Sequence, residues 1–139
     1  MPKRKITLLE RADGDLETVR RLLPSSSDEV MIDICAYHCQ QCAEKIAKFL
    51  ILLEGKEYCA DHRSDQYLQD LEDAEAKELI KTVSYKIDSW ATSIRYSRTA
   101  MSNKSAVEEV FTVCEQLVKL AKSRVPTVVE TSNAPIPKP

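Results

Sequence analysis

Three groups of side chains in this sequence have types and spacings that could support chemistry. The first is a Cys-x-x-Cys motif, Cys39 to Cys42, with Cys35 and His38 close by in the chain. Zinc takes such ligands, but structural pairs of this kind normally lie on a turn and need a second pair from elsewhere. Here the cysteines fall inside a helical pattern, where small apolar contacts between helices are the favoured interpretation. We therefore expect no metal site.

The second group is a stripe of polar residues at three- and four-residue spacings. Its members are Tyr37, Gln41, Glu44, Lys45 and Lys48. One interpretation is a solvated helix face, on which Glu44 and Lys48 form an i, i+4 pair that contributes a few tenths of a kcal/mol. The other is a functional face or a contact between subunits. Spacing alone favours the solvated face.

The third group is the run Arg95-Tyr96-Ser97-Arg98, where a long helical pattern fades. Two arginines one turn apart beside a tyrosine could hold a phosphate and stack on a base. Alternatively, the two cations only complement the negative end of the helix dipole. Without further information, the pattern favours the dipole interpretation.

Signatures of several enzyme classes are missing from the chain. The only histidines are His38 and His62, and neither has the spacing of a His-Glu-x-x-His metal motif. The sequence contains neither a Gly-x-x-x-x-Gly-Lys-Ser/Thr phosphate loop nor a Gly-x-Ser-x-Gly nucleophile turn. From these patterns we predict no catalytic residues and no cofactor.

Composition restricts the class of protein further. The 139 residues contain 20 Lys and Arg against 22 Asp and Glu, which argues against nucleic-acid binding by bulk charge but leaves a local basic patch possible. Only 2 residues are Gly, so β-rich folds with many tight turns are disfavoured. No apolar stretch approaches the ~18 residues that would cross a membrane. The odd count of 5 Cys suits free thiols in a reducing cytoplasm.

Helical periodicity accounts for most of the chain up to residue 124. Apolar residues recur at helical spacing in four long segments and one short one, which are approximately residues 8–23, 29–54, 67–71, 73–94 and 105–124. The segment 29–54 has an unusually broad apolar stripe and is expected to lie centrally, against several neighbours. Gly55 is expected to end it in a left-handed conformation. Capping boxes are predicted at Thr7–Glu10, Ser26–Glu29 and Ser105–Glu108.

These elements predict an all-α fold. We expect an up-down helical bundle of four long helices plus one short helix, mostly antiparallel, over residues 5–124. Residues 125–139 are rich in proline, and we expect them to form a flexible tail outside the core.

The run from Ala36 to Leu50 resembles the signature helix of HEPN domains. The matching positions are Tyr37, His38, Gln41, Glu44, Lys45 and Lys48. Weaker similarities follow: His62 is similar to the histidine of a Thr-His-x-Leu step, and Arg95-Tyr96 to an Arg-Tyr-Pro segment. The resemblance extends over about residues 9–124. It implies a helical bundle that forms a homodimer with a cleft between the protomers.

The resemblance also implies a set of activities. Many HEPN proteins are metal-independent ribonucleases, often toxins paired with a minimal nucleotidyltransferase, and others bind nucleotide or RNA. In the nucleases, an arginine and a histidine are separated by four to six residues, so the histidine stands five to seven positions after the arginine. After Arg95 those positions hold Ala100, Met101 and Ser102, so the motif is missing here.

The sequence therefore favours a non-catalytic HEPN-like module, cytoplasmic and dimeric. It would bind a nucleotide or an RNA phosphate, or act as the partner of a nucleotidyltransferase. The predicted ligand-binding residues are Arg95, Tyr96, Arg98, Lys45, Lys48 and His62. The alternatives are a divergent ribonuclease that uses His62 or Tyr96 beside Arg95, and a purely structural interaction protein.

Overall fold

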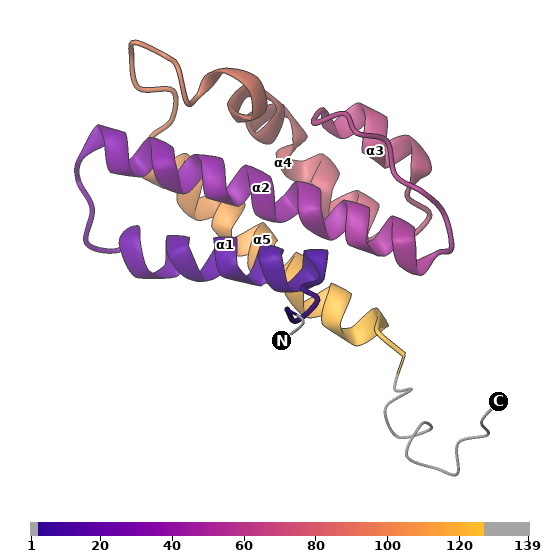
Figure 1. The fold of residues 1–139 in the computed structure, drawn as a ribbon. Helices are drawn as coiled ribbons and strands as arrows, with labels where there is room; N and C mark the ends of the chain where they lie inside the picture. The colour runs from indigo at the N-terminus through magenta and orange to yellow at the C-terminus, as the bar shows by residue number, and fades with distance from the viewer. Residues whose placement is uncertain (1–2, 127–139) are drawn as a thin grey trace, which may run out of the picture.

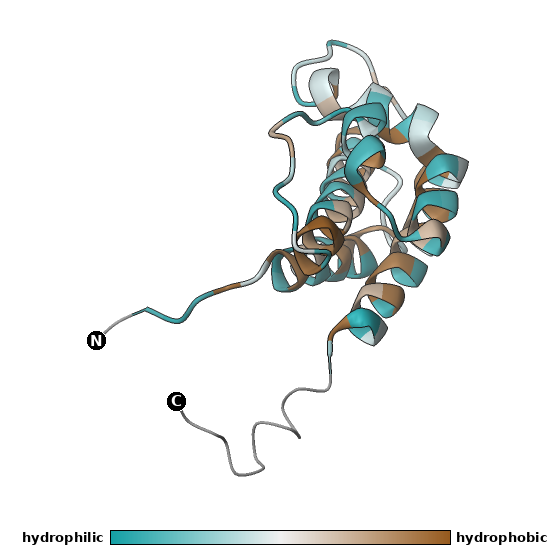
Figure 2. Ribbon diagram, turned by 90° about the vertical axis from the view of Figure 1, so that its right-hand side faces the viewer, coloured by the Kyte–Doolittle hydropathy of each residue, from teal (hydrophilic) through white to brown (hydrophobic). Residues whose placement is uncertain are grey.

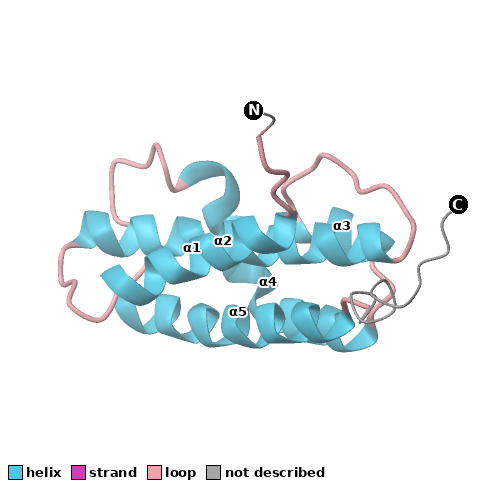
Figure 3. Ribbon diagram, turned by 60° about the horizontal axis from the view of Figure 1, so that its bottom comes forward, coloured by secondary structure: helices cyan, strands magenta, loops and turns pink. Residues whose placement is uncertain are grey.

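Within the part of the chain that the structure describes, the protein is a bundle of five helices. The computed structural model describes residues 3–126, and in this range it contains no strand (Figure 3). The helices are α1 (Leu8–Leu22), α2 (Glu29–Leu53), α3 (Ser64–Asp70), α4 (Ala74–Ser93) and α5 (Lys104–Arg124). The predicted all-α fold of four long helices and one short helix is confirmed. The predicted tail at 125–139 lies outside the described residues from residue 127 onward.

α2 occupies the centre of the bundle. It contacts each of the other four helices, as its broad apolar stripe predicts. α1 lies beside α2 and joins it through a short turn, while α4 and α5 lie across the other sides of α2 (Figure 1). The short α3 packs between α2 and α4, and its start is held by Asp88, which accepts hydrogen bonds from the Ser64 amide and hydroxyl, both at 2.7 Å.

Short polar side chains start the helices. Thr7 and Glu10 form the predicted capping box of α1: the Glu10 amide donates to the Thr7 hydroxyl at 3.1 Å, and the Thr7 amide donates to the Glu10 carboxylate at 3.0 Å. At the end of α2, Gly55 has a φ of 81°, the left-handed conformation expected there.

The other two predicted capping boxes are wrong. α2 is capped by Asp28, which accepts from the Val30 amide at 2.7 Å, while the Ser26 hydroxyl donates back to the Leu22 carbonyl. α5 is capped by Asn103, which accepts from the Ala106 amide at 2.9 Å. In both cases a better acceptor, a carboxylate or an amide oxygen, stands two residues from the predicted serine and defines the boundary.

The core is formed where the apolar stripes of the helices meet. The buried residues of all five helices are mainly hydrophobic. Figure 2, a view along the bundle, colours the ribbon by hydropathy and shows hydrophobic and hydrophilic residues alternating along each helix. Four cysteines, Cys35, Cys39, Cys42 and Cys114, are fully buried within this core, as the apolar-contact interpretation requires. Burial raises the pKa of the Cys35 thiol to about 11, so it stays protonated.

Within the described part of the chain, no helix is both long and apolar enough to cross a bilayer.

Candidate functional site

Three arrangements of polar side chains lie along α2, and the first faces α1. The Asp15 carboxylate on α1 is bonded to His38 Nδ1 at 2.8 Å and to the Lys45 ammonium at 2.6 Å. Asp15 is 9% exposed, so its charge is compensated almost entirely by these two neighbours. The signature residues His38 and Lys45 thus tie α2 to α1.

The second arrangement is a largely buried network on another side of α2. Glu44 accepts from Gln40 at 2.7 Å and from Lys48 at 2.8 Å, and it is 2.9 Å from His62 Nδ1. Glu44 and Lys48 are 5% and 6% exposed, so the interpretation of the stripe as a solvated face is wrong for them. The Lys48 ammonium also lies 5.2 Å from the centre of the Tyr58 ring. Residues of the α2–α3 loop therefore cover the Glu44–Lys48 pair.

A buried tyrosine adjoins this network. Tyr67 on α3 is fully buried, and its hydroxyl has no hydrogen-bond partner among the described residues. Burial raises the pKa of the Tyr67 phenol well above its usual 10.0, and the nearby negative charge of Glu44 adds to this effect. Tyr67 is therefore a neutral phenol near neutral pH.

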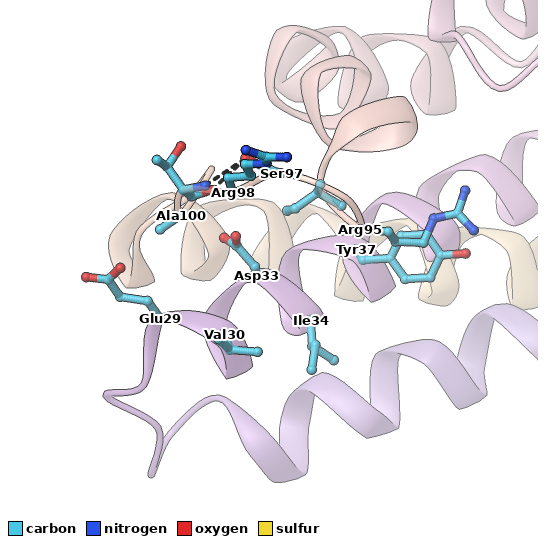
Figure 4. Close-up of a pocket in the computed structure, with 11 residues that line it drawn as sticks. Glu29, Val30, Asp33, Ile34, Tyr37, Arg95, Ser97, Arg98 and Ala100 are labelled. Carbon is cyan, nitrogen blue, oxygen red and sulfur yellow. Dashed lines mark hydrogen bonds between the residues drawn. The ribbon is translucent and has the colours of Figure 1, made fainter.

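The third arrangement surrounds an open cavity of about 660 Å³ between the first half of α2 and the segment that follows α4 (Figure 4). Val30, Ile34 and Tyr37 line it from α2, and Arg95 and Arg98 line it from the α4–α5 connection. The side chains of Val30 and Ile34 are 66% and 38% exposed, which makes this side of α2 apolar as well as open.

The Arg95 guanidinium lies close to two aromatic rings. Its central carbon is 5.0 Å from the centre of the Tyr37 ring and 5.5 Å from that of Tyr96. Cations are attracted to the faces of such rings, so both tyrosines hold the guanidinium in place without consuming its hydrogen-bond donors. Figure 4 shows Arg95 over Tyr37 at one side of the cavity.

Arg95 and Arg98 both retain free donors. Within residues 3–126, neither guanidinium has a hydrogen bond or an ion pair, whereas Lys45 and Lys48 are each paired with a buried carboxylate. The cavity also contains the carboxylates of Glu29 and Asp33, and Asp33 is bonded to backbone and side-chain donors of the α4–α5 connection. Two free guanidiniums beside an apolar surface can bind an anionic group attached to a flat, partly apolar body.

The predicted ligand-binding residues therefore do not form one site but lie in three different parts of the structure. Arg95 and Arg98 line the cavity, and the Tyr96 ring lies next to Arg95. Lys45 contacts α1, Lys48 belongs to the buried network, and the exposed His62 contacts that network through Glu44. A role in ligand binding for Lys45, Lys48 and His62 stays a prediction. Among residues 3–126, no group of three or more His, Cys, Asp and Glu side chains could hold a metal ion.

Several functional neighbours were missed from the sequence. Asp15, Gln40 and Asp33 each bond a residue that is distant along the chain or buried. A weak signal existed for two of them: Asp15 adjoins the apolar stripe of α1, and Gln40 precedes Glu44 by one turn. For Asp33 no local pattern pointed to a partner 68 residues away.

The arrangement of helices and the signature side chains on α2 agree with a comparison against protein families. The HEPN domain model matches residues 7–124, and the chain belongs to this family. Comparisons with curated proteins and with solved structures gave no match.

Proposed function

We propose that this protein is a non-catalytic HEPN module that binds a nucleotide or an RNA phosphate at the cavity lined by Tyr37, Arg95 and Arg98, with the Tyr96 ring next to Arg95. The observation that carries the proposal is the Arg95 guanidinium, which contacts two tyrosine rings while its donors have no partner within residues 3–126. A cation that only complements the dipole of α4 would not need two aromatic contacts or an adjoining cavity.

Binding would use the two cations and the aromatic rings for different parts of the ligand. The planar guanidinium of Arg95 can donate two parallel hydrogen bonds to phosphate oxygens, and Arg98 can add further donors. The Tyr96 ring is 77% exposed and is available for stacking on a base, an interaction worth about 1–3 kcal/mol in single-stranded nucleic-acid complexes.

The lack of catalysis is part of the proposal. The positions five to seven residues after Arg95 hold no histidine, and His62 is bonded to the buried Glu44. Cleavage of RNA by general acid–base catalysis needs a proton-transfer group within hydrogen-bond reach of the reacting oxygen. We therefore expect no cleavage of a single-stranded RNA in the presence of a chelator.

We propose that the cavity side of α2 also forms the contact with a partner protein. A homodimer that joins the apolar cavity faces of two protomers would cover Val30 and Ile34, which a monomer exposes. A minimal nucleotidyltransferase is the second proposed partner, and it would dock on the dimer.

The ligand proposal is tested by titrating the protein with ADP and with a short single-stranded RNA. Arg95→Ala and Arg98→Ala should each weaken binding about tenfold or more, since a hydrogen bond to a charged group contributes about 1.5–3 kcal/mol. The matched control is Arg63→Ala, because Arg63 is exposed and lies in the α2–α3 loop. No binding by the unmodified protein, or equal losses in all three variants, would overturn the proposal.

A further inference from the structure

The Asp33 carboxylate on α2 accepts several hydrogen bonds from the α4–α5 connection. It accepts from the Met101 amide at 3.0 Å and, through its other oxygen, from the Ser102 amide at 3.1 Å and the Ser102 hydroxyl at 3.2 Å. These residues follow Arg98 by three and four positions. One half-buried side chain therefore fastens the segment that presents Arg98 to the cavity.

Two further contacts restrain the α4–α5 connection: one at its end and one between two of its own residues. The Lys104 ammonium donates to the carbonyls of Pro24 and Ser26, at 3.0 and 3.1 Å, and so joins the start of α5 to the α1–α2 turn. The Ser97 hydroxyl donates to the Thr99 carbonyl at 2.6 Å (Figure 4). Residues 95–100 are exposed, and two contacts join the connection to α2: Arg95 over the Tyr37 ring at its start, and Asp33 with Met101 and Ser102 further on.

We propose that Asp33 is a positioning residue for anion binding: it holds the α4–α5 connection against α2 and thereby keeps Arg98 in the lining of the cavity, to which Arg95 also contributes. The proposal rests on the anion-binding function proposed above. A ligand then meets a site that is already assembled, so little binding free energy is spent on ordering the connection.

The proposal can be tested by the direction in which anion affinity changes when Asp33 is replaced. Asp33 is a negative charge in the wall of the cavity that we propose binds an anion. By charge alone, its removal should therefore strengthen anion binding. If Asp33 acts by holding the connection, its removal should weaken anion binding, because Arg98 is no longer fixed. The same cavity contains Glu29, an exposed carboxylate with no hydrogen bond to the connection within the described residues. Glu29→Gln therefore reports the effect of charge alone.

The first experiment measures the connection without any ligand. Trypsin cleaves after arginine, and cleavage at Arg98 requires the connection to leave α2, so its rate reports local opening. Asp33→Asn should speed cleavage at Arg98 severalfold, and Glu29→Gln should leave the rate unchanged. Saturating inorganic phosphate should slow cleavage of the unmodified protein. An unchanged rate in Asp33→Asn would overturn the proposal.

The second experiment measures ADP affinity in the same proteins. Asp33→Asn should weaken ADP binding roughly tenfold, as the loss of hydrogen bonds to a charged group predicts, while Glu29→Gln binds ADP as well or better. Tighter ADP binding by Asp33→Asn would show that Asp33 is only a wall charge and would overturn the proposal. If Asp33→Asn does not fold, Ser102→Ala replaces it, with a smaller change in the same direction.

The two experiments separate the two proposals. If the unmodified protein binds neither ADP nor RNA, the proposed function fails, and the positioning role of Asp33 in anion binding fails with it. Faster cleavage of Asp33→Asn would then still establish the contact between Asp33 and the connection. If ADP binds and cleavage is unchanged, only the role of Asp33 is refuted.

Discussion

Glu44 is a buried carboxylate surrounded by donors from its own helix and from the loop that follows it. Gln40 and Lys48 bond it from one turn before and one turn after, and His62 closes the site from the loop. Removing two charges from water costs several kcal/mol per ion, and only this complete set of partners offsets that cost. Removal of any one member therefore leaves the remaining polar groups buried without a partner, which should lower the stability of the fold.

Lys48→Met should lower the free energy of unfolding by about 3 kcal/mol or more, because it leaves the Glu44 charge buried without its cation. Urea unfolding of the variant measures the loss. Lys81→Met is the control: Lys81 and Glu78 form an exposed pair at 3.9 Å, whose loss should change stability by less than about 0.5 kcal/mol. Equal changes in the two variants would contradict the importance of the buried pair.

At the scale of elements, the ends of three helices are joined at one end of the bundle. The Glu54 carboxylate at the end of α2 accepts from the amides of Glu72 and Asp73, each at 3.0 Å. Asp73 in turn caps α4 and is bonded to Arg124, the last residue of α5, at 2.7 Å. These contacts connect α2, α4 and α5 where the loops alone would leave their ends free.

Asp73 should give this junction a defined dependence on pH. The hydrogen bond from Arg124 lowers the pKa of Asp73 below its ordinary 3.8, so the folded state favours the charged form. The resulting stabilisation is fully present above pH 3.8 and is lost as the pH falls through the lowered pKa of the folded state.

Asp73→Asn preserves a capping side chain but removes the charge that binds Arg124. We expect a loss of about 1 kcal/mol at pH 7, and this difference from the unmodified protein should shrink as the pH falls below the ordinary pKa of Asp73. Thermal unfolding over a pH series measures it, with exposed Asp65→Asn as the control. A difference that is constant down to pH 2 would rule out the charge effect.

At the scale of the whole molecule, the apolar side of α2 beside the cavity has no cover within the described residues. Val30 and Ile34 are exposed there, next to the cations that we assign to ligand binding. A dimer formed through this face would bring two such cavities together. The exposed Tyr85 on α4 has no comparable surroundings and offers no such surface.

Sedimentation should show a dimer at micromolar concentration, and Ile34→Glu should convert it to a monomer, because a carboxylate would be buried without a partner at the interface. Tyr85→Glu, on an exposed side of α4, should leave the dimer intact. Circular dichroism checks that both variants keep their helices. A monomer from the unmodified protein would refute the proposed homodimer.

The amino-acid sequence by itself determined the helices, the central place of α2 and the family resemblance. These follow from local rules: apolar residues at helical spacing define which face is buried, and neighbouring residues cap each end. Thr7 with Glu10 and Gly55 were predictable for this reason. The caps Asp28 and Asn103 were not predicted. Several acceptors compete near a helix start, and the packing of neighbouring elements selects among them.

Only the tertiary structure decided which polar groups meet. Lys48 follows the pattern of a solvated face, yet the loop that carries Tyr58 and His62 covers it. Asp33 and Ser102 come together because α4 and α5 return the chain to the first half of α2. Hydrogen bonds and ion pairs between distant residues depend on how whole helices pack, and the spacing of residues along one helix does not contain that information.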